Sequence, residues 1–244
     1  MTSLLNVKHL GKKDILHDIS FTMEQGEMTA IMGPSGSGKS TLLYNVSGMD
    51  QADSGEVWLN GTELVGLNED EKASLRLNRM GFVFQQMNVL ANLNLLDNIM
   101  LPAVHAEKRK KEQHRQQALE RMAEFHIMDL ADRRVTEVSG GQLQRACICR
   151  SVMLEPEILF ADEPTGALNQ SAAQEVMQAF LKLNRAGTSI LMVTHDSRVA
   201  SRCERILYLL DGKIRGELSL GKFKSEEERV REQKVSDWLG KLGW

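Results

Sequence analysis

The feature that constrains this chain most is a glycine-rich loop that spans residues 33–41. Its sequence, Gly-Pro-Ser-Gly-Ser-Gly-Lys-Ser-Thr, fits the pattern of a phosphate-binding loop placed between a strand and a helix. The apolar run at residues 27–32 predicts a buried strand before it, and residues 40–47, which stop at Gly48, predict a helix after it. Because both flanking elements are present, we interpret the loop as a phosphate site and not as a chance glycine-rich turn.

The residue types of this loop explain how it would hold a phosphate. Glycines let successive backbone N–H groups turn towards an anion, and the start of the following helix adds a partial positive charge. We expect Lys39 to reach the β- and γ-phosphates of a nucleotide, and the Ser40 hydroxyl to be a ligand of Mg²⁺. The predicted nucleotide-binding residues of the loop are Gly33, Pro34, Ser35, Gly36, Ser37, Gly38, Lys39, Ser40 and Thr41.

The rest of the chain predicts a mainly parallel α/β sheet with two additions. Short apolar runs at residues 80–85, 158–160 and 189–193 predict strands that alternate with helices. The Asn60-Gly61 pair after an alternating run predicts a hairpin, and hence an antiparallel sheet beside the main one. Residues from about 87 to 136 are helix-like and interrupt the alternation, so they predict an inserted helical subdomain, with a helix over residues 92–101 stopped by Pro102.

The C-terminal residues 221–244 lie outside these patterns and predict a helical tail that follows a main domain of residues 1–220. Five apolar residues fall roughly on one helical stripe, opposite many charges. They are Val230, Val235, Trp238, Leu239 and Leu242. We expect this stripe to pack on its own domain, and a contact with a partner or a second copy is the alternative.

Polar side chains follow several of the predicted strands. Asp162 and Glu163 end one strand, Gln85 ends another and His195 follows a third. Ligands of parallel sheets lie beyond the carboxyl ends of the strands, where these groups would meet the glycine-rich loop. Asp162 suits a Mg²⁺ site, and Glu163 could accept a proton from an attacking water. Alone, each would more simply be a turn or a structural histidine, but together with the loop they predict catalysis.

The composition argues against several classes of protein. The 244 residues carry a net charge of −3, so no overall basic field attracts nucleic acid. The three cysteines do not give an even-numbered disulfide framework, and we interpret them as reduced thiols. Apolar runs stay well short of the ~20 residues that cross a bilayer, and the N-terminus lacks the apolar core of a signal peptide. We therefore expect a cytoplasmic protein that meets a membrane only through a partner.

The sequence also resembles a known family. Residues 138–142, Val-Ser-Gly-Gly-Gln, resemble the signature motif of ABC ATPases. That family carries a P-loop, a glutamine, the signature, an Asp-Glu pair and a histidine in the order found here, and the resemblance runs from about residue 5 to residue 215. The wording of residues 81–85, 161–168 and 194–196 is similar to the branch of macrolide exporters, lipoprotein-releasing systems, cell-division ABC ATPases and bacitracin-type resistance systems.

The resemblance implies an α/β fold with a P-loop NTPase core, and a head-to-tail homodimer with two ATP molecules and Mg²⁺ at its interface. The loop of one subunit would face the signature of the other, which adds Ser139, Gly140, Gly141 and Gln142 to the nucleotide-binding residues. Gln85 would contact Mg²⁺ or the attacking water. His195 would hold the γ-phosphate and orient the base Glu163.

Two positions depart from the family pattern. An aromatic residue that stacks on adenine usually stands about where this chain has Leu10, which offers apolar contact without a π-face. We therefore expect weak discrimination between bases. The aspartate that the family places before the following helix is Asn169 here, which keeps a hydrogen-bonding carbonyl but loses the charge.

The sequence thus predicts the ATP-hydrolysing subunit of an ABC transporter, bound to a separate integral membrane permease on the inner face of the membrane. Met87, Val89, Leu90 and Leu93 could receive a helix of that permease, or could be ordinary core. Candidate cargoes are an antimicrobial peptide, a macrolide or a lipoprotein. The alternative function is a soluble ABC ATPase acting on ribosomes or DNA, although such proteins usually carry two such domains or a long coiled-coil insert. A module that binds ATP without hydrolysis is disfavoured by the presence of Glu163 and His195.

Overall fold

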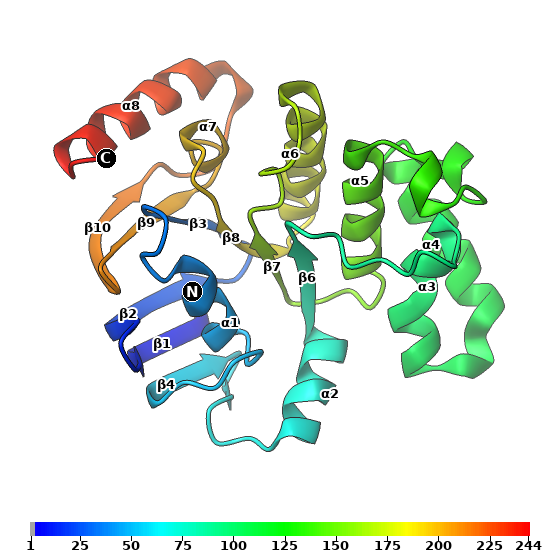
Figure 1. Ribbon diagram of the computed structural model, residues 1–244, viewed down its shortest axis with the longest axis horizontal. Helices are drawn as coiled ribbons and strands as arrows, with labels where there is room; N and C mark the ends of the chain where they lie inside the picture. Colours follow the sequence, from blue (N-terminus) through cyan, green and yellow to red (C-terminus); the bar gives the residue numbers. More distant parts are fainter. Residues whose placement is uncertain (1–2) are drawn as a thin grey trace.

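The computed structural model describes residues 3–244, which form two sheets surrounded by helices (Figure 1). A six-stranded sheet has the order β10-β9-β3-β8-β7-β6, and a four-stranded sheet has the order β2-β1-β4-β5. The strands of the larger sheet are β3 (Met28–Met32), β6 (Met80–Phe84), β7 (Ile158–Asp162), β8 (Ser189–Val193), β9 (Arg205–Leu210) and β10 (Lys213–Ser219). Neighbouring strands within this sheet pair in parallel, except that β9 and β10 pair antiparallel. The predicted fold class is therefore confirmed.

The smaller sheet is antiparallel and consists of β1 (Ser3–Lys12), β2 (Leu16–Glu24), β4 (Ser54–Leu59) and β5 (Thr62–Glu63). The predicted hairpin joins β4 to β5, and both turn residues, Asn60 at φ 43° and Gly61 at φ 79°, take the left-handed conformation that a tight two-residue hairpin requires. A second turn of this kind, Asp211-Gly212, joins β9 to β10.

Three strands of the larger sheet, β3, β7 and β8, are buried at every position, so the side chains on both of their faces lie in a core. In β7, for example, Leu159 and Ala161 belong to an apolar core shared with helices, whereas Ile158 and Phe160 belong to a second core shared with the antiparallel sheet. The helix α1 (Lys39–Val46) lies in this second core through Leu42, Leu43 and Val46. The glycine-rich loop thus starts from a strand and enters a helix that are both fixed by packing.

Helices α3 (Leu95–Ala106), α4 (Lys111–Glu124) and α5 (Gly140–Ser151) group beyond β6, at the opposite end of the sheet from β10 (Figure 1). The predicted stop at Pro102 is wrong, because α3 continues through this proline. Burial of Ile99, Met100 and Ala103 outweighs the backbone hydrogen bond that the proline cannot donate. The division of the chain into a main domain, an inserted helical subdomain and a tail stays a prediction.

The remaining helices are α2 (Glu69–Arg79), α6 (Gln170–Arg185), α7 (Ser197–Ala200) and α8 (Glu228–Lys241). In α8, Val235 and Leu239 are buried in the core that the larger sheet shares with the helices, and Trp238 and Leu242 pack against it. Val230 is 70% exposed, because it precedes Val235 by five residues and therefore points to another side of the helix. Among residues 3–244, every helix is too short or too polar to cross a membrane.

Candidate active site

The predicted site residues come from four neighbouring strand ends. The glycine-rich loop follows β3, Asp162 ends β7, Gln85 follows β6 and the segment after β8 carries His195. Strands β3, β8, β7 and β6 are consecutive and parallel, so their carboxyl ends lie along one edge of the sheet. The order of the strands therefore brings together groups that are far apart in the sequence, such as Lys39 and His195, which are 156 positions apart.

The glycine-rich loop has the backbone that its sequence predicts. Gly38 precedes α1 with a φ of 96°, and a Cβ atom there would lie 3.0 Å from Leu16 Cδ2 and 3.2 Å from Ile15 Cγ2. Lys39 is only 8% exposed, and its Nζ donates a hydrogen bond of 2.9 Å to the Pro34 carbonyl across the loop. Burial lowers the pKa of Lys39, although the charges of Glu163 and Asp162 partly oppose this effect. The two carboxylates therefore act electrostatically on the lysine.

The loop fits a phosphate group by a second criterion. The Ser37 hydroxyl is buried beside Gly33 of the loop and has no hydrogen-bond partner among residues 3–244. A buried polar atom without a partner costs free energy, so a ligand oxygen placed in the loop would satisfy it. Ser37, Lys39 and the N–H groups at the start of α1 are the groups that could hold phosphate oxygens.

The Asp162 carboxylate is held from α1 at both of its oxygens. The Ser40 hydroxyl donates to Oδ1 at 2.9 Å, and the Tyr44 hydroxyl donates to Oδ2 at 2.7 Å. Burial, together with the hydrogen bond to Asp162, raises the pKa of Tyr44 to about 12, so the phenol keeps its proton at neutral pH. Ser40 and Asp162 are hard oxygen ligands side by side, which suits Mg²⁺. Tyr44 was not among the predicted site residues, although its place four residues after Ser40 puts it on the same face of α1.

Glu163 and His195 form the other polar pair. His195 Nδ1 lies 3.1 Å from Glu163 Oε2, and the Glu163 side chain is 23% exposed. Glu163 has a φ of 45°, a left-handed conformation that is uncommon for a side chain of this kind and typical of functional sites. A Cβ atom on Gly166 would lie 3.1 Å from Gln85 Nε2 and 3.2 Å from Glu163 Oε2. The Gln85 amide and the Glu163 carboxylate therefore both lie next to Gly166.

The signature residues form the start of α5. Ser139 caps the helix, because its hydroxyl accepts a hydrogen bond from the Gln142 N–H and the Gln142 side chain accepts one from the Ser139 N–H. A Cβ atom on Gly141 would lie 2.7 Å from Ala172 Cβ, so this end of α5 packs closely on α6. Within one chain, α5 and α1 stand on opposite sides of β7 and β6 (Figure 1), and the signature is not brought to the loop of its own chain.

The same helix contacts the segment that follows β6. Gln144 Nε2 donates to the Phe84 carbonyl at 3.2 Å, Cys147 Sγ donates to the Met87 carbonyl at 3.3 Å, and Arg150 donates to the Met87 and Asn88 carbonyls at 3.0 and 2.8 Å. These three side chains recur every third residue, so they share one face of α5. The segment that carries Gln85 is therefore attached along the length of the helix that begins at the signature. Beyond the helical spacing, nothing in the sequence indicates this contact.

The prediction that Leu10 contacts the nucleotide is wrong. Its side chain is fully buried in the core between the sheets. Leu5 and Val7 already point into that core, but the pairing of β1 with β2 shifts between Val7 and Leu10, and His9 takes a φ of 50°. The extra residue of such a bulge reverses the facing of the side chains that follow, so Leu10 points inward.

Ile15, which was not predicted as a site residue either, is 39% exposed and lies beside Gly38 of the loop. It is an apolar side chain on the surface next to the predicted nucleotide. The only signal for it was its place directly after the turn residues 11–14. Asn169 caps α6, with its side chain accepting a hydrogen bond of 2.9 Å from the Ala172 N–H, a role in which an aspartate would do the same.

Comparison with known proteins agrees with this geometry. The model of the ABC transporter family matches residues 16–166. The chain is similar to the ABC transporter ATP-binding protein YxdL of Bacillus subtilis, with 40% identity over all of this chain and 96% of the relative. It is 42% identical to the macrolide export ATP-binding/permease protein MacB of Bartonella henselae, but over 82% of this chain it spans only 30% of that protein. The dimeric ATP-binding cassette MJ0796, solved in a post-hydrolysis state bound to ADP and Pi, is 35% identical, with a TM-score of 0.78 over 90% of this chain and 100% of that one.

Proposed function

The chain belongs to the ABC transporter family of ATP-hydrolysing proteins, and we propose that it is the subunit whose ATP hydrolysis drives a conformational change in a separate membrane subunit. The observation that carries this proposal is the meeting of four strand ends at the glycine-rich loop. There, Asp162 bonds to Ser40 of the loop and the neighbouring Glu163 bonds to His195.

Each side chain then has one task in hydrolysis. Glu163 takes a proton from the water that attacks the γ-phosphorus, while the bond to the leaving β-phosphate oxygen breaks. His195 holds the Glu163 carboxylate through Nδ1 and keeps it at the strand end. Lys39, buried and released from the Pro34 carbonyl, supplies positive charge to the β- and γ-phosphates.

A divalent cation fits the pair of oxygens on Ser40 and Asp162. When bound, Mg²⁺ neutralises the negative charge of the phosphate oxygens and orients them. Ser40 and Asp162 would hold it, and the Gln85 amide, which borders Glu163 near Gly166, would hold the cation or the attacking water.

A homodimer would complete the site. The signature lies away from the loop of its own chain, and Ser139 and Gly140 are exposed at the start of α5. The first N–H groups of a helix have no partner within it, so a second copy could place them on the γ-phosphate. The dimeric state of the solved relative MJ0796 supports this arrangement.

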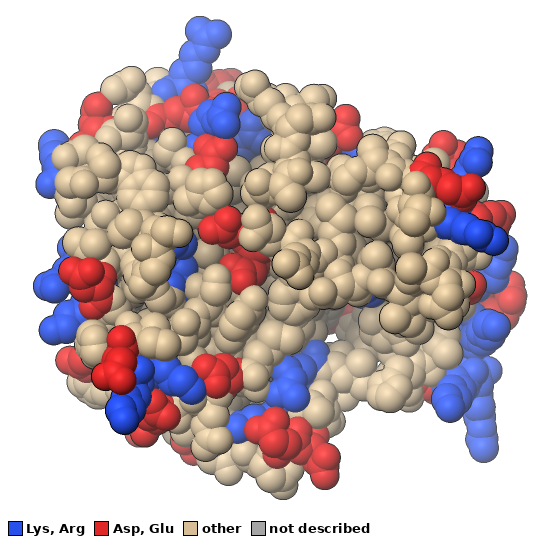
Figure 2. Space-filling view, viewed as in Figure 1, with Lys and Arg blue, Asp and Glu red and all other residues tan. Residues whose placement is uncertain are grey.

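A groove between α2 and the group α3–α5 would receive the membrane subunit. The groove has a volume of about 420 Å³ and a mostly apolar lining that includes Met49, Leu77, Phe84, Pro102 and Leu154. Figure 2 shows this face hollowed between the two parts. An apolar face of a short helix fits such a groove. Leu90 is 49% exposed and lies on the segment that follows Gln85. We propose that Leu90, with Met87, Val89 and Leu93, also contacts the membrane subunit.

We infer that the protein works on the inner face of the membrane, held there by the permease. The name of MacB joins an ATP-binding part and a permease in one protein, which supports a permease as the partner of this chain. A macrolide is a cargo suggested by that name, and an antimicrobial peptide or a lipoprotein is suggested by the resemblance noted in the sequence. Binding of nucleic acid is not part of the proposal.

The decisive experiment is the substitution Glu163→Gln. Gln keeps the size of the side chain but cannot accept the proton, so we expect ATP to bind and hydrolysis to fall by ~10²–10⁴. Because ATP would join two subunits, the variant should accumulate as a dimer in Mg-ATP and return to a monomer in Mg-ADP, as measured by size-exclusion chromatography with light scattering. Hydrolysis at the wild-type rate would remove Glu163 as the base, and an inactive variant that stays monomeric in ATP would contradict the shared site.

The membrane partner is tested by affinity purification from membranes solubilised in detergent. Met49→Asp puts a charge in the groove at a residue that is 44% exposed, and Val230→Asp makes the same change on α8, away from the groove. We expect a membrane protein to co-purify with the wild type and with Val230→Asp but not with Met49→Asp. Recovery of ribosomes or DNA in its place would favour the soluble alternative.

A further inference from the structure

Tyr44 contacts the proposed cation site without being one of its ligands. Its hydroxyl donates to Asp162 Oδ2 at 2.7 Å, whereas the Ser40 hydroxyl occupies the other oxygen, Oδ1. Ser40 and Tyr44 stand four residues apart on α1 and therefore reach β7 from the same face of the helix. Asp162 itself is 9% exposed, so few water molecules compete for its oxygens.

The position of Tyr44 is fixed from two sides. Its ring packs against the core between the sheets. Its backbone carbonyl accepts hydrogen bonds from the N–H groups of Met49 and Asp50, which fold the next segment back onto α1. Because the ring and the backbone of Tyr44 are both held, the side chain loses little further conformational freedom when its hydroxyl bonds to a carboxylate.

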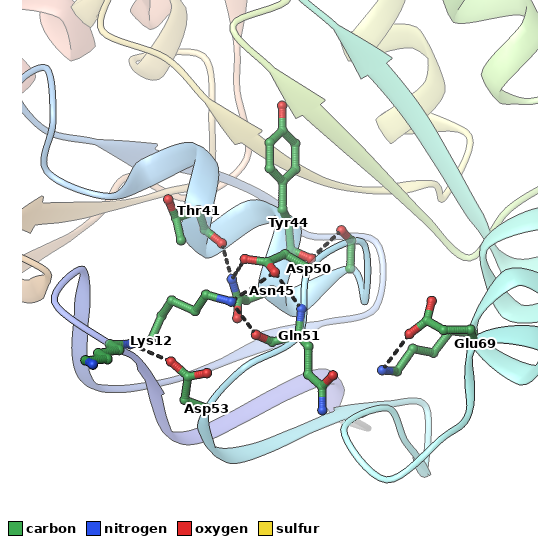
Figure 3. A network of polar contacts seen from close by, with 11 residues as sticks. Lys12, Thr41, Tyr44, Asn45, Asp50, Gln51, Asp53 and Glu69 are labelled. Carbon is green, nitrogen blue, oxygen red and sulfur yellow. Dashed lines mark hydrogen bonds and ion pairs between the residues drawn. The ribbon is translucent and has the colours of Figure 1, made fainter.

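A polar network holds the far side of this helix (Figure 3). Lys12 donates to Asp50 Oδ1 at 2.9 Å and to the Gln51 carbonyl at 2.7 Å, and the Asn45 amide donates to Asp50 Oδ2 at 3.1 Å. The ring of Tyr44 points away from this network. The end of α1 is thus tied to β1, and the hydroxyl of Tyr44 cannot easily follow a movement of Asp162.

We propose that Tyr44 is a positioning residue for the divalent cation, because it fixes the rotation of the Asp162 carboxylate so that Oδ1 faces Ser40. This inference rests on the proposed function of the Ser40–Asp162 pair. A carboxylate can turn about its last bond, and a donor on one oxygen alone leaves that turn free. With the Tyr44 hydroxyl bonded to Oδ2, the other oxygen, Oδ1, is left to face the cation. Hydrogen-bond partners of metal ligands commonly orient the ligands in this way.

The test uses Mn²⁺ as a spin probe with the full chain and ADP. Tyr44→Phe removes the hydroxyl and leaves the ring in place. Free Mn²⁺ is measured by electron paramagnetic resonance during a titration, and ADP binding is measured separately in EDTA. We expect Mn²⁺ to bind about 10- to 100-fold more weakly to the variant, with unchanged ADP affinity in EDTA. The matched control is Tyr208→Phe, the same change at the other tyrosine of the chain, in β9, which should alter neither quantity.

Two results would overturn the inference. Mn²⁺ affinity within about twofold of the wild type would show that the hydroxyl does not orient the ligand. A loss of ADP affinity in EDTA that equals the loss with Mn²⁺ would show that Tyr44 only supports the fold, and thermal denaturation of the variant checks this independently.

Asp162→Asn separates this inference from the proposed function. If Asp162→Asn binds Mn²⁺ with ADP as the wild type does, the cation site itself is wrong. If Asp162→Asn loses the cation and Tyr44→Phe keeps it, the site stands and only the role of Tyr44 falls.

Discussion

His195 Nδ1 lies 3.1 Å from Glu163 Oε2, and this contact joins the segments that follow two neighbouring parallel strands. The histidine is the more exposed partner, with 59% of its side chain accessible against 23% for the glutamate. Glu163 also sits on a left-handed backbone. The contact with His195 Nδ1 therefore restrains the orientation of the Glu163 carboxylate.

We therefore predict that His195→Ala slows hydrolysis strongly and leaves ATP binding nearly intact. The loss should be of the order of 10²–10⁴, the range of a general-base contribution, because the base is no longer oriented. Steady-state phosphate release and binding of a fluorescent ATP analogue check both parts. The exposed His105→Ala is the matched control. Equal rates for the two variants would show that His195 is not needed.

Lys39→Ala should abolish hydrolysis and also weaken ATP binding. The buried ammonium group supplies charge-assisted hydrogen bonds to phosphate, and losing bonds of ~1.5–3 kcal/mol corresponds to about 10- to 100-fold in affinity. Equilibrium dialysis with ATP and a turnover assay measure the two effects. The same change at the exposed Lys234 should alter neither. Near-normal turnover of Lys39→Ala would contradict the site.

Leu10→Tyr should destabilise the fold without improving nucleotide binding. The residue is fully buried, and overpacking a core costs about 1–3 kcal/mol. Ile15→Tyr, in contrast, adds an aromatic face on the surface beside Gly38, where stacking on a base is worth about 1–3 kcal/mol. Thermal denaturation and competition between ATP and GTP distinguish the two variants. Tighter ATP binding by a stable Leu10→Tyr variant would show that the side chain at position 10 faces the nucleotide and not the core.

Glu157→Gln should destabilise the protein in a pH-dependent way. Arg79 donates to Glu157 Oε1 at 2.6 Å and to Oε2 at 3.0 Å, and this bonding lowers the pKa of Glu157 in the folded protein. The stabilisation, about 1–2 kcal/mol, is therefore present above the unfolded pKa of about 4.3 and is lost as the pH falls through the folded value.

Urea unfolding of both proteins at neutral pH and near pH 3 checks this prediction. The difference in the free energy of unfolding should shrink at the lower pH. A difference that stays constant would mean that the Glu157 substitution acts through packing and not through charge.

The sequence predicted the central fold well, because the glycine-rich loop needs a strand before it and a helix after it. It also predicted the two-residue turn at Asn60-Gly61, whose residue types readily adopt the left-handed backbone that this turn requires. It failed at Leu10, because a bulge at His9 changes which face the next side chains occupy, and alternation alone does not reveal a bulge. It failed at Pro102 because the stabilisation of α3 comes from packing, which is not a local property.

The roles of the predicted site residues could be named from the sequence. The side chains that hold these residues in place could not. Tyr44 reaches Asp162 across 118 positions of sequence, and Arg150 reaches Asn88 across 62. Such contacts depend on how helices dock on the sheet. Helical spacing shows which residues share a face, but it does not show what that face meets.

Helix α5 packs closely on α6 near its start, and its polar contacts with the segment after β6 extend from Gln144 to Arg150. Gly141 touches Ala172 two residues after Ser139, whereas Arg150 holds the segment after β6 nine residues further on. At 1.5 Å per residue, these arms measure ~3 Å and ~13 Å. If the helix turns as a rigid body about Gly141, it is a lever with unequal arms, and a shift of about 2 Å at Arg150 becomes about 0.5 Å at Ser139. A large displacement at the Arg150 end would then arrive at Ser139 as a small one.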